Sequence, residues 1–99
     1  MVHEMMVALT VADDAQYDAY RAAMLPILTE YGGGFRYDFD VATVRKTASD
    51  HPINRVFTIH FYDRAAKDAF FADPRYCEVK ARFFASSVTG TTIVGAWDR

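Results

Sequence analysis

One histidine stands where an acid or a base could act, in the middle of a segment of alternating side chains. Apolar and polar residues alternate across residues 55–62, and Thr58 and Tyr62 flank His60 two positions away on the same face. An imidazole has an ordinary pKa of about 6.5, so it can gain or lose a proton at neutral pH. His60 is therefore either an acid or base, or a histidine that is hydrogen-bonded within an interface between subunits.

Further polar residues occupy neighbouring predicted strands. Thr10 and Arg36 are candidates, with Thr58 and Tyr62, for binding a substrate near His60. Asp38 and Asp40 are expected on the same face as Arg36, and paired carboxylates can act as acid and base when their surroundings separate their pKa values. Charges on an edge strand also prevent aggregation between sheets, and this second explanation is favoured for the two aspartates.

The sequence predicts neither a metal site nor a cofactor. A metal site needs several ligands that converge, and the three histidines and the single cysteine have no ligand spacing (His3, His51, His60 and Cys77). The three glycines at 32–34 follow a predicted helix, so they predict a helix cap instead of a phosphate cradle.

The elements that must position these residues follow from periodicity and capping. Alternation predicts strands over residues 3–11, 35–45 and 55–62, and a run rich in Thr, Ile and Val predicts a fourth over 89–97. Helical spacing and capping aspartates predict helices from Asp13 to Tyr31, over 64–72, and from Asp73 to about Ser86. The order βαββαβ predicts one ferredoxin-like α+β domain over residues 1–99, with two helices on one face of a four-stranded antiparallel sheet.

Each patterned strand has an apolar face, which we assign to the helices. On this assignment Phe57, Ile59 and Phe61 point towards the helices, as do Phe35, Tyr37, Phe39 and Val41. His60 then lies on the opposite, mixed face, because successive side chains of a strand alternate.

Composition favours self-association. Hydrophobic residues make up 52% and aromatic residues 15% of only 99 residues, so some aromatic side chains are expected in an interface or a pocket. A net charge of −2 without a basic run argues against nucleic acid, and no apolar stretch is long enough for a membrane span. One cysteine and no recognisable signal peptide favour a cytoplasmic protein.

The chain resembles the DUF1330 family of the dimeric α+β barrel superfamily, which also contains the antibiotic-biosynthesis-type monooxygenases. Dispersed pieces carry the resemblance, in order: Tyr17-Asp18-Ala19-Tyr20, Tyr31-Gly32-Gly33, residues 54–61, Phe70-Phe71-Ala72-Asp73-Pro74-Arg75-Tyr76 and Lys80-Ala81-Arg82. The family usually has a glutamate where this chain has His60. The resemblance implies the fold and a homodimer whose two sheets pack through the mixed face; it implies no particular reaction.

Two functions follow as hypotheses. The first is an uncharacterised small-molecule-binding protein, acting as a cofactor-independent monooxygenase- or isomerase-like enzyme with His60 in the dimer barrel. The second is a non-catalytic binding or accessory homodimer. A cavity of about 300 Å³ or more would favour a small-molecule site.

Overall fold

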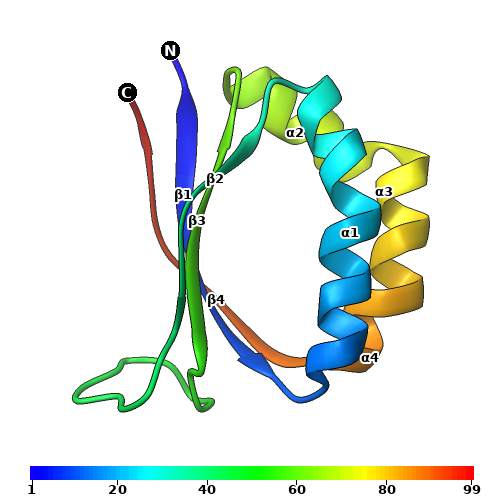
Figure 1. Cartoon of the computed structure of the whole chain (residues 1–99). Helices are drawn as coiled ribbons and strands as arrows, with labels where there is room; N and C mark the ends of the chain where they lie inside the picture. The colour runs from blue at the N-terminus through cyan, green and yellow to red at the C-terminus, as the bar shows by residue number, and fades with distance from the viewer.

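Strands and capped helices follow one another along the chain in the order that the sequence predicts (Figure 1). The computed structural model describes all residues, 1–99. The strands are β1 (His3–Val11), β2 (Gly34–Asp40), β3 (Arg55–Phe61) and β4 (Val88–Asp98). The helices are α1 (Asp14–Glu30), α2 (Arg64–Ala72), α3 (Pro74–Val79), the π-helical turn η1 (Lys80–Phe84) and α4 (Ala85–Ser87). The predicted ferredoxin-like α+β fold is confirmed.

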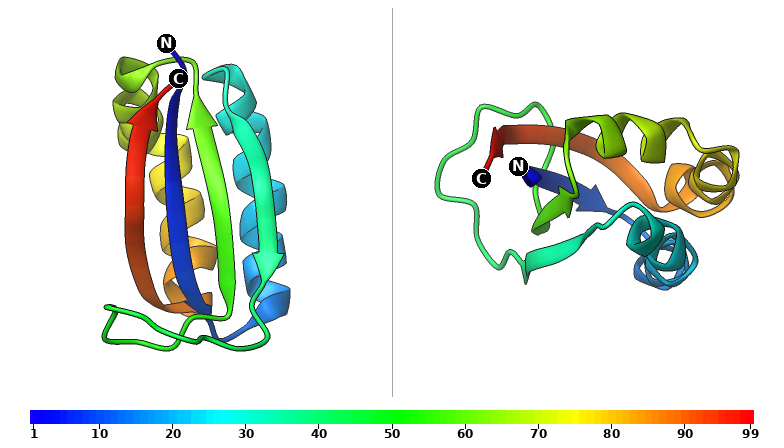
Figure 2. Two further views of the ribbon diagram at one scale, coloured as in Figure 1. Left: turned by 90° about the vertical axis from the view of Figure 1, so that its left-hand side faces the viewer. Right: turned by 90° about the horizontal axis from the view of Figure 1, so that it is seen from above.

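The four strands form one antiparallel sheet in the order β2-β3-β1-β4. The helices all cover one face of this sheet, and no helix covers the other, which we call the outer face (Figures 1 and 2). The segment between β2 and β3 curves out on the side of the outer face. None of the helices combines the length and the hydropathy needed to span a membrane.

Aspartates begin the helices, as their positions in the sequence predict. The side chains of Asp13, Asp63 and Asp73 each accept a hydrogen bond from a backbone N–H of the first turn that follows. Helix α1 ends where Gly32 adopts a φ of 67°, and the N–H of Gly33 then donates to the carbonyl of Leu28.

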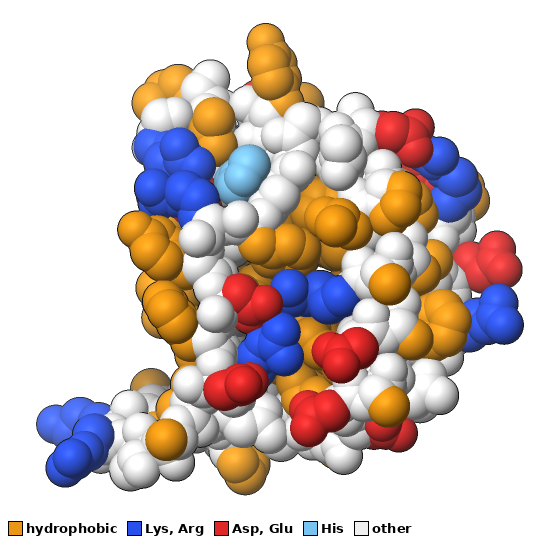
Figure 3. Space-filling view, in the orientation of Figure 1, with side chains coloured by type: hydrophobic (Ala, Val, Ile, Leu, Met, Phe, Trp, Pro, Cys, Tyr) orange, Lys and Arg blue, Asp and Glu red, His pale blue; other side chains and the backbone are white.

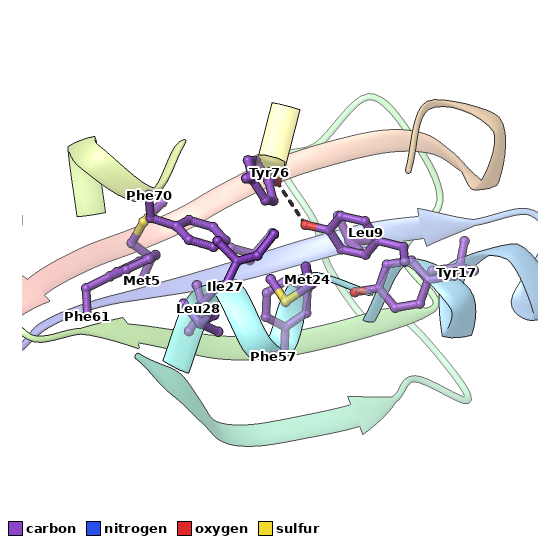
Figure 4. Packing of buried hydrophobic residues seen from close by; sticks show 14 residues of the cluster. Met5, Leu9, Tyr17, Met24, Ile27, Leu28, Phe57, Phe61, Phe70 and Tyr76 are labelled. Atoms are coloured by element: carbon purple, nitrogen blue, oxygen red, sulfur yellow. Dashed lines mark hydrogen bonds between the residues drawn. The ribbon is translucent and has the colours of Figure 1, made fainter. Parts of the chain in front are cut away.

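The core lies between the helices and the inner face of the sheet (Figure 4). Phe57, Ile59 and Phe61 of β3 are buried there, which confirms the predicted alternation of that strand. Alternate residues of β1 and the predicted apolar stripe of α1 complete most of the cluster (Met5, Val7, Leu9, Val11, Tyr17, Tyr20, Met24, Ile27 and Leu28).

The predicted faces of β2 are wrong beyond Phe35. Phe35 pairs with Ile59 on the helix side, but a bulge at Arg36 shifts the register so that Tyr37 pairs with Thr58 on the outer face. A bulge inserts one extra residue, and every later side chain then changes face. Tyr37 and Phe39 are therefore exposed outside the sheet, and the strand ends at Asp40 instead of continuing to residue 45.

Candidate functional site

His60 lies on the outer face near one end of β3, as predicted. Its neighbours across the sheet are Glu4 of β1 and Gly34 of β2. A Cβ atom on Gly34 would come within 3.1 Å of His60 Nε2, so the glycine leaves room for the imidazole. Partial burial, followed by the positive charge of Arg99, lowers the pKa of His60. The neutral imidazole is thus favoured.

The strongest polar arrangement of the outer face is built on Glu4, beside His60. The Glu4 carboxylate is fully buried and accepts two hydrogen bonds from Arg36, at 2.8 Å each. It also accepts hydrogen bonds from Trp97 Nε1 at 3.1 Å and Arg99 Nε at 3.0 Å. Chiefly through the hydrogen bonds of Arg36, these donors lower the pKa of Glu4 to about 2. The arrangement fixes β2 and the end of β4 to β1. It also brings together Arg36 and His60, which were both predicted as site residues.

Of the other predicted binding residues, Thr58 shares the outer face of β3 with His60, whereas Tyr62 and Thr10 have their contacts elsewhere. Thr58 is buried, and its hydroxyl oxygen accepts the backbone N–H of Tyr37, so it supports the bulge of β2. Tyr62 lies beyond the end of β3, with its Cβ against Gly32. It lines an open cavity of about 460 Å³ at the end of α1, with Tyr31.

Thr10 belongs to a separate network at the opposite end of β1. Its hydroxyl bonds to Nδ1 of His51, at 2.8 Å, and to the carbonyl of Pro52. The other ring nitrogen of His51 bonds to the hydroxyl of Thr92, which bonds to that of Ser49. The network attaches the β2–β3 connection to strands β1 and β4 of the sheet. No role for His51 follows from the sequence, because its partners on β1 and β4 lie about forty residues away along the chain.

Asp38 points to the helix side, away from Arg36, contrary to the prediction. It accepts hydrogen bonds from Arg55 at 2.8 Å and from Arg21 of α1 at 3.1 Å. Acidic and basic side chains gather over the hollow between the sheet and α1 (Figure 3). The guanidinium of Arg21 also lies 3.9 Å from the centre of the Phe35 ring. This cluster joins α1 to the edge of the sheet, and its charges are compensated.

A largely apolar cavity of about 260 Å³ lies between the sheet and the helices. Its floor is the inner face of β1 and β3, and the edge strand β4 borders one side (Met5, Val7, Leu9, Phe57, Ile59, Thr91 and Ile93). Ten of the twelve residues that line it are hydrophobic. The cavity is slightly smaller than the roughly 300 Å³ at which pockets for drug-sized ligands begin, so it suits a molecule of one ring. His60 does not line it.

The helical wall of this cavity carries a pair of phenols. Tyr20 and Tyr76 join their hydroxyl groups in a hydrogen bond of 2.9 Å, drawn as a dashed line in Figure 4. Burial raises the pKa of both phenols, so both remain protonated at neutral pH. The pair has two hydroxyl hydrogens and uses one between its members, which leaves one available to an acceptor. Phe71, Lys80 and Phe84 complete the wall.

A third cavity, of about 520 Å³, is open and polar. It lies where β1, α1 and β3 meet, and its lining includes Asp14, Asp18 and Asp40. Like the apolar cavity between the sheet and the helices, it is lined by none of the residues predicted as a site. No group of three or more His, Cys, Asp or Glu side chains is arranged to hold a metal ion.

A comparison with models of known protein families shows which family this chain belongs to. The model of DUF1330, a domain of unknown function, matches residues 5–97. The chain belongs to the DUF1330 family. The resemblance inferred from the sequence is thus confirmed, and the DUF1330 description gives no reaction. No curated protein matches the chain.

Solved structures share the fold of this DUF1330 protein. A protein of unknown function from Rhodopseudomonas palustris has a TM-score of 0.81 at 17% identity, over 99% of this chain and 82% of that one. A dimeric ferredoxin-like protein from Jannaschia sp. CCS1 has a TM-score of 0.59 at 18% identity, over 100% of both chains. The cofactor-independent oxygenase SnoaB from Streptomyces nogalater has a TM-score of 0.60 at 16% identity, over 99% of this chain and 91% of that one.

Proposed function

We propose that this protein binds a small molecule with a single ring in the cavity between its helices and its sheet. The observation that carries the proposal is the cavity itself, about 260 Å³ in volume and lined mainly by apolar side chains. At about 30 Å³ for each water in the liquid, this space equals roughly nine waters. Ligand sites of this kind are concave and mostly apolar, with a few polar groups that orient the ligand.

The polar groups of the cavity favour a ligand that carries an oxygen acceptor. The spare hydroxyl hydrogen of the Tyr20–Tyr76 pair can donate to a carbonyl or hydroxyl oxygen of the ligand. No carboxylate or imidazole lines the cavity, and the two phenols stay protonated. The lining therefore lacks the imidazole and carboxylate groups that most often act as a general base, which favours binding over proton abstraction at this place.

A catalytic role of His60, with Arg36, Thr58, Tyr62 and Thr10 as binding residues, stays a prediction. Oxygenase or isomerase activity also stays a prediction, because similarity to SnoaB at 16% identity concerns the fold.

We also propose that the protein is a homodimer through its outer face. Tyr37 and Phe39 stack on that face with ring centres 6.0 Å apart, and both are about half exposed. A second copy would cover them, and proteins of this fold from Jannaschia sp. CCS1 and Bacteroides fragilis are described as dimeric. His60 and Arg36 would then lie inside the dimer, away from the proposed cavity.

The test of ligand binding uses a neighbouring pair of exposed residues on β4. Ile93 is 57% exposed and lines the cavity, whereas Val94 is 58% exposed and does not. Benzyl alcohol should shift the NMR signals of the Val7, Leu9 and Ile59 methyl groups. The larger side chain of Ile93→Phe should reduce these shifts, and Val94→Phe should leave them unchanged. Unchanged methyl signals in the unmodified protein, or equal effects of both variants, would contradict the proposal.

A further inference from the structure

We infer that the ligand of this cavity is an anion, a ring compound that carries a carboxylate or a similar acidic group. The inference rests on the proposed function, since it names the chemical class of the ligand bound at the same place. The residue that carries it is Lys80, the only charged residue among the twelve that line the cavity.

Lys80 stands at the mouth of the cavity. It is exposed, and it is the first residue of η1, where α3 passes into a π-helical turn. Its ammonium group lies 5.9 Å from the centre of the Phe84 ring, which also lines the cavity. Single π-helical turns occur frequently at functional sites, because they change the direction of the side chains that follow.

The charge of Lys80 is uncompensated. Most other basic side chains of the protein pair with a carboxylate, as Arg21, Arg55 and Arg75 do, but Lys80 forms no salt bridge. No acidic residue lines the cavity. A cation beside an apolar space favours a ligand whose apolar ring enters the cavity and whose negative group remains at the mouth.

The lining also argues against a cationic ligand. An ammonium group on the ring would meet Lys80 at the mouth, and it would find no carboxylate within the cavity. A neutral ring compound would gain the apolar contacts and nothing from Lys80. Affinity should therefore decrease from anionic to neutral to cationic compounds of the same shape.

Three probes of one shape test this order: benzoate, benzyl alcohol and benzylamine. Isothermal titration at low salt should show that benzoate binds two- to fivefold more tightly than benzyl alcohol, since an exposed charge pair contributes up to about 1 kcal/mol. Benzylamine should bind most weakly. High salt should remove the advantage of benzoate, because ions screen exposed charges.

Two variants assign the effect to one residue. Lys80→Gln should weaken benzoate about two- to fivefold and leave benzyl alcohol unchanged. Arg82→Gln is the matched control, because Arg82 lies on the same turn, is exposed, forms no salt bridge and does not line the cavity. It should change neither probe.

Benzoate that binds no more tightly than benzyl alcohol would overturn the inference, as would equal losses in the two variants. These outcomes leave the proposed function standing, because benzyl alcohol still binds. If none of the three probes binds, the proposed function itself fails. The comparison of probes on the unmodified chain needs no variant, so a folding defect cannot obscure it.

Discussion

Replacing Glu4 with glutamine should destabilise the protein at neutral pH, and the destabilisation should be smaller at acidic pH. Glu4 is fully buried on the outer face, and four N–H groups of Arg36, Trp97 and Arg99 converge on its two oxygens. Glutamine keeps the shape, but it places an NH₂ group against donors that need an acceptor.

The size of the effect follows from these contacts. A hydrogen bond to a charged group contributes about 1.5–3 kcal/mol. Because the side chains of Arg36 and Arg99 are 44% and 37% exposed, water can replace part of what they lose. We expect a loss of about 2–4 kcal/mol in the free energy of unfolding at pH 7, and a fall in Tm of at least about 8 °C.

The pH dependence follows from the low pKa of Glu4. The folded protein holds this pKa at about 2, against an ordinary value of 4.5. A depressed pKa stabilises the folded state above the ordinary value, and the contribution is lost as the pH falls from 4.5 towards 2. The difference between Glu4→Gln and the unmodified protein should therefore narrow over this range.

Thermal and urea unfolding from pH 7 to pH 3 measure the effect. Asp40→Asn is the control, because the carboxylate of Asp40 is 93% exposed and forms only a long ion pair with Arg55, at 3.9 Å. It should change stability by less than about 0.5 kcal/mol. If Glu4→Gln is as stable as the control, or if its stability difference from the unmodified protein does not narrow below pH 4.5, the Glu4 carboxylate does not hold these strands together.

Three further results are expected. Sedimentation velocity at micromolar concentration should show a dimer. Phe39→Glu should shift it towards monomer, and Tyr62→Glu, just beyond the end of β3, should not; a monomeric unmodified protein would contradict the proposed interface. NMR titration should give His60 a pKa below 6.5, because the imidazole is partly buried beside Arg99. The contribution of His60 to folding stability should therefore fall as the pH drops below 6.5. A raised pKa of His60 would be inconsistent with these surroundings. Ile59→Ala should cost about 2–4 kcal/mol in urea unfolding, because Ile59 is buried; a cost below about 0.5 kcal/mol would show that the residue does not belong to the core.

Local patterns in the sequence were sufficient to predict most of the fold. The alternation of β3 is uninterrupted, so the two-residue period correctly placed Ile59 on the helix side of the sheet and His60 on the outer face. Asp13, Asp63 and Asp73 have short-range partners, so capping rules located the helix starts.

Features that depend on pairing between distant segments could not be predicted in the same way. The bulge at Arg36 reverses the faces of Tyr37 and Asp38, and it is set by the register against β3. His51 gains its partners only when the β2–β3 connection reaches β1 and β4. The cavity arises from the packing of α1, α2, α3 and η1 over the sheet, and no periodicity describes an empty volume.

The position of a bound ring distinguishes the proposed cavity from a site in the dimer barrel. Intermolecular nuclear Overhauser effects should be measured between benzoate and the methyl groups of the protein. We predict contacts with Ile59 and Ile93, which line the cavity between the helices and the sheet. Contacts confined to the outer face, for example to Met6 opposite Thr58, would rule out the proposed cavity and place the ligand in the dimer barrel instead.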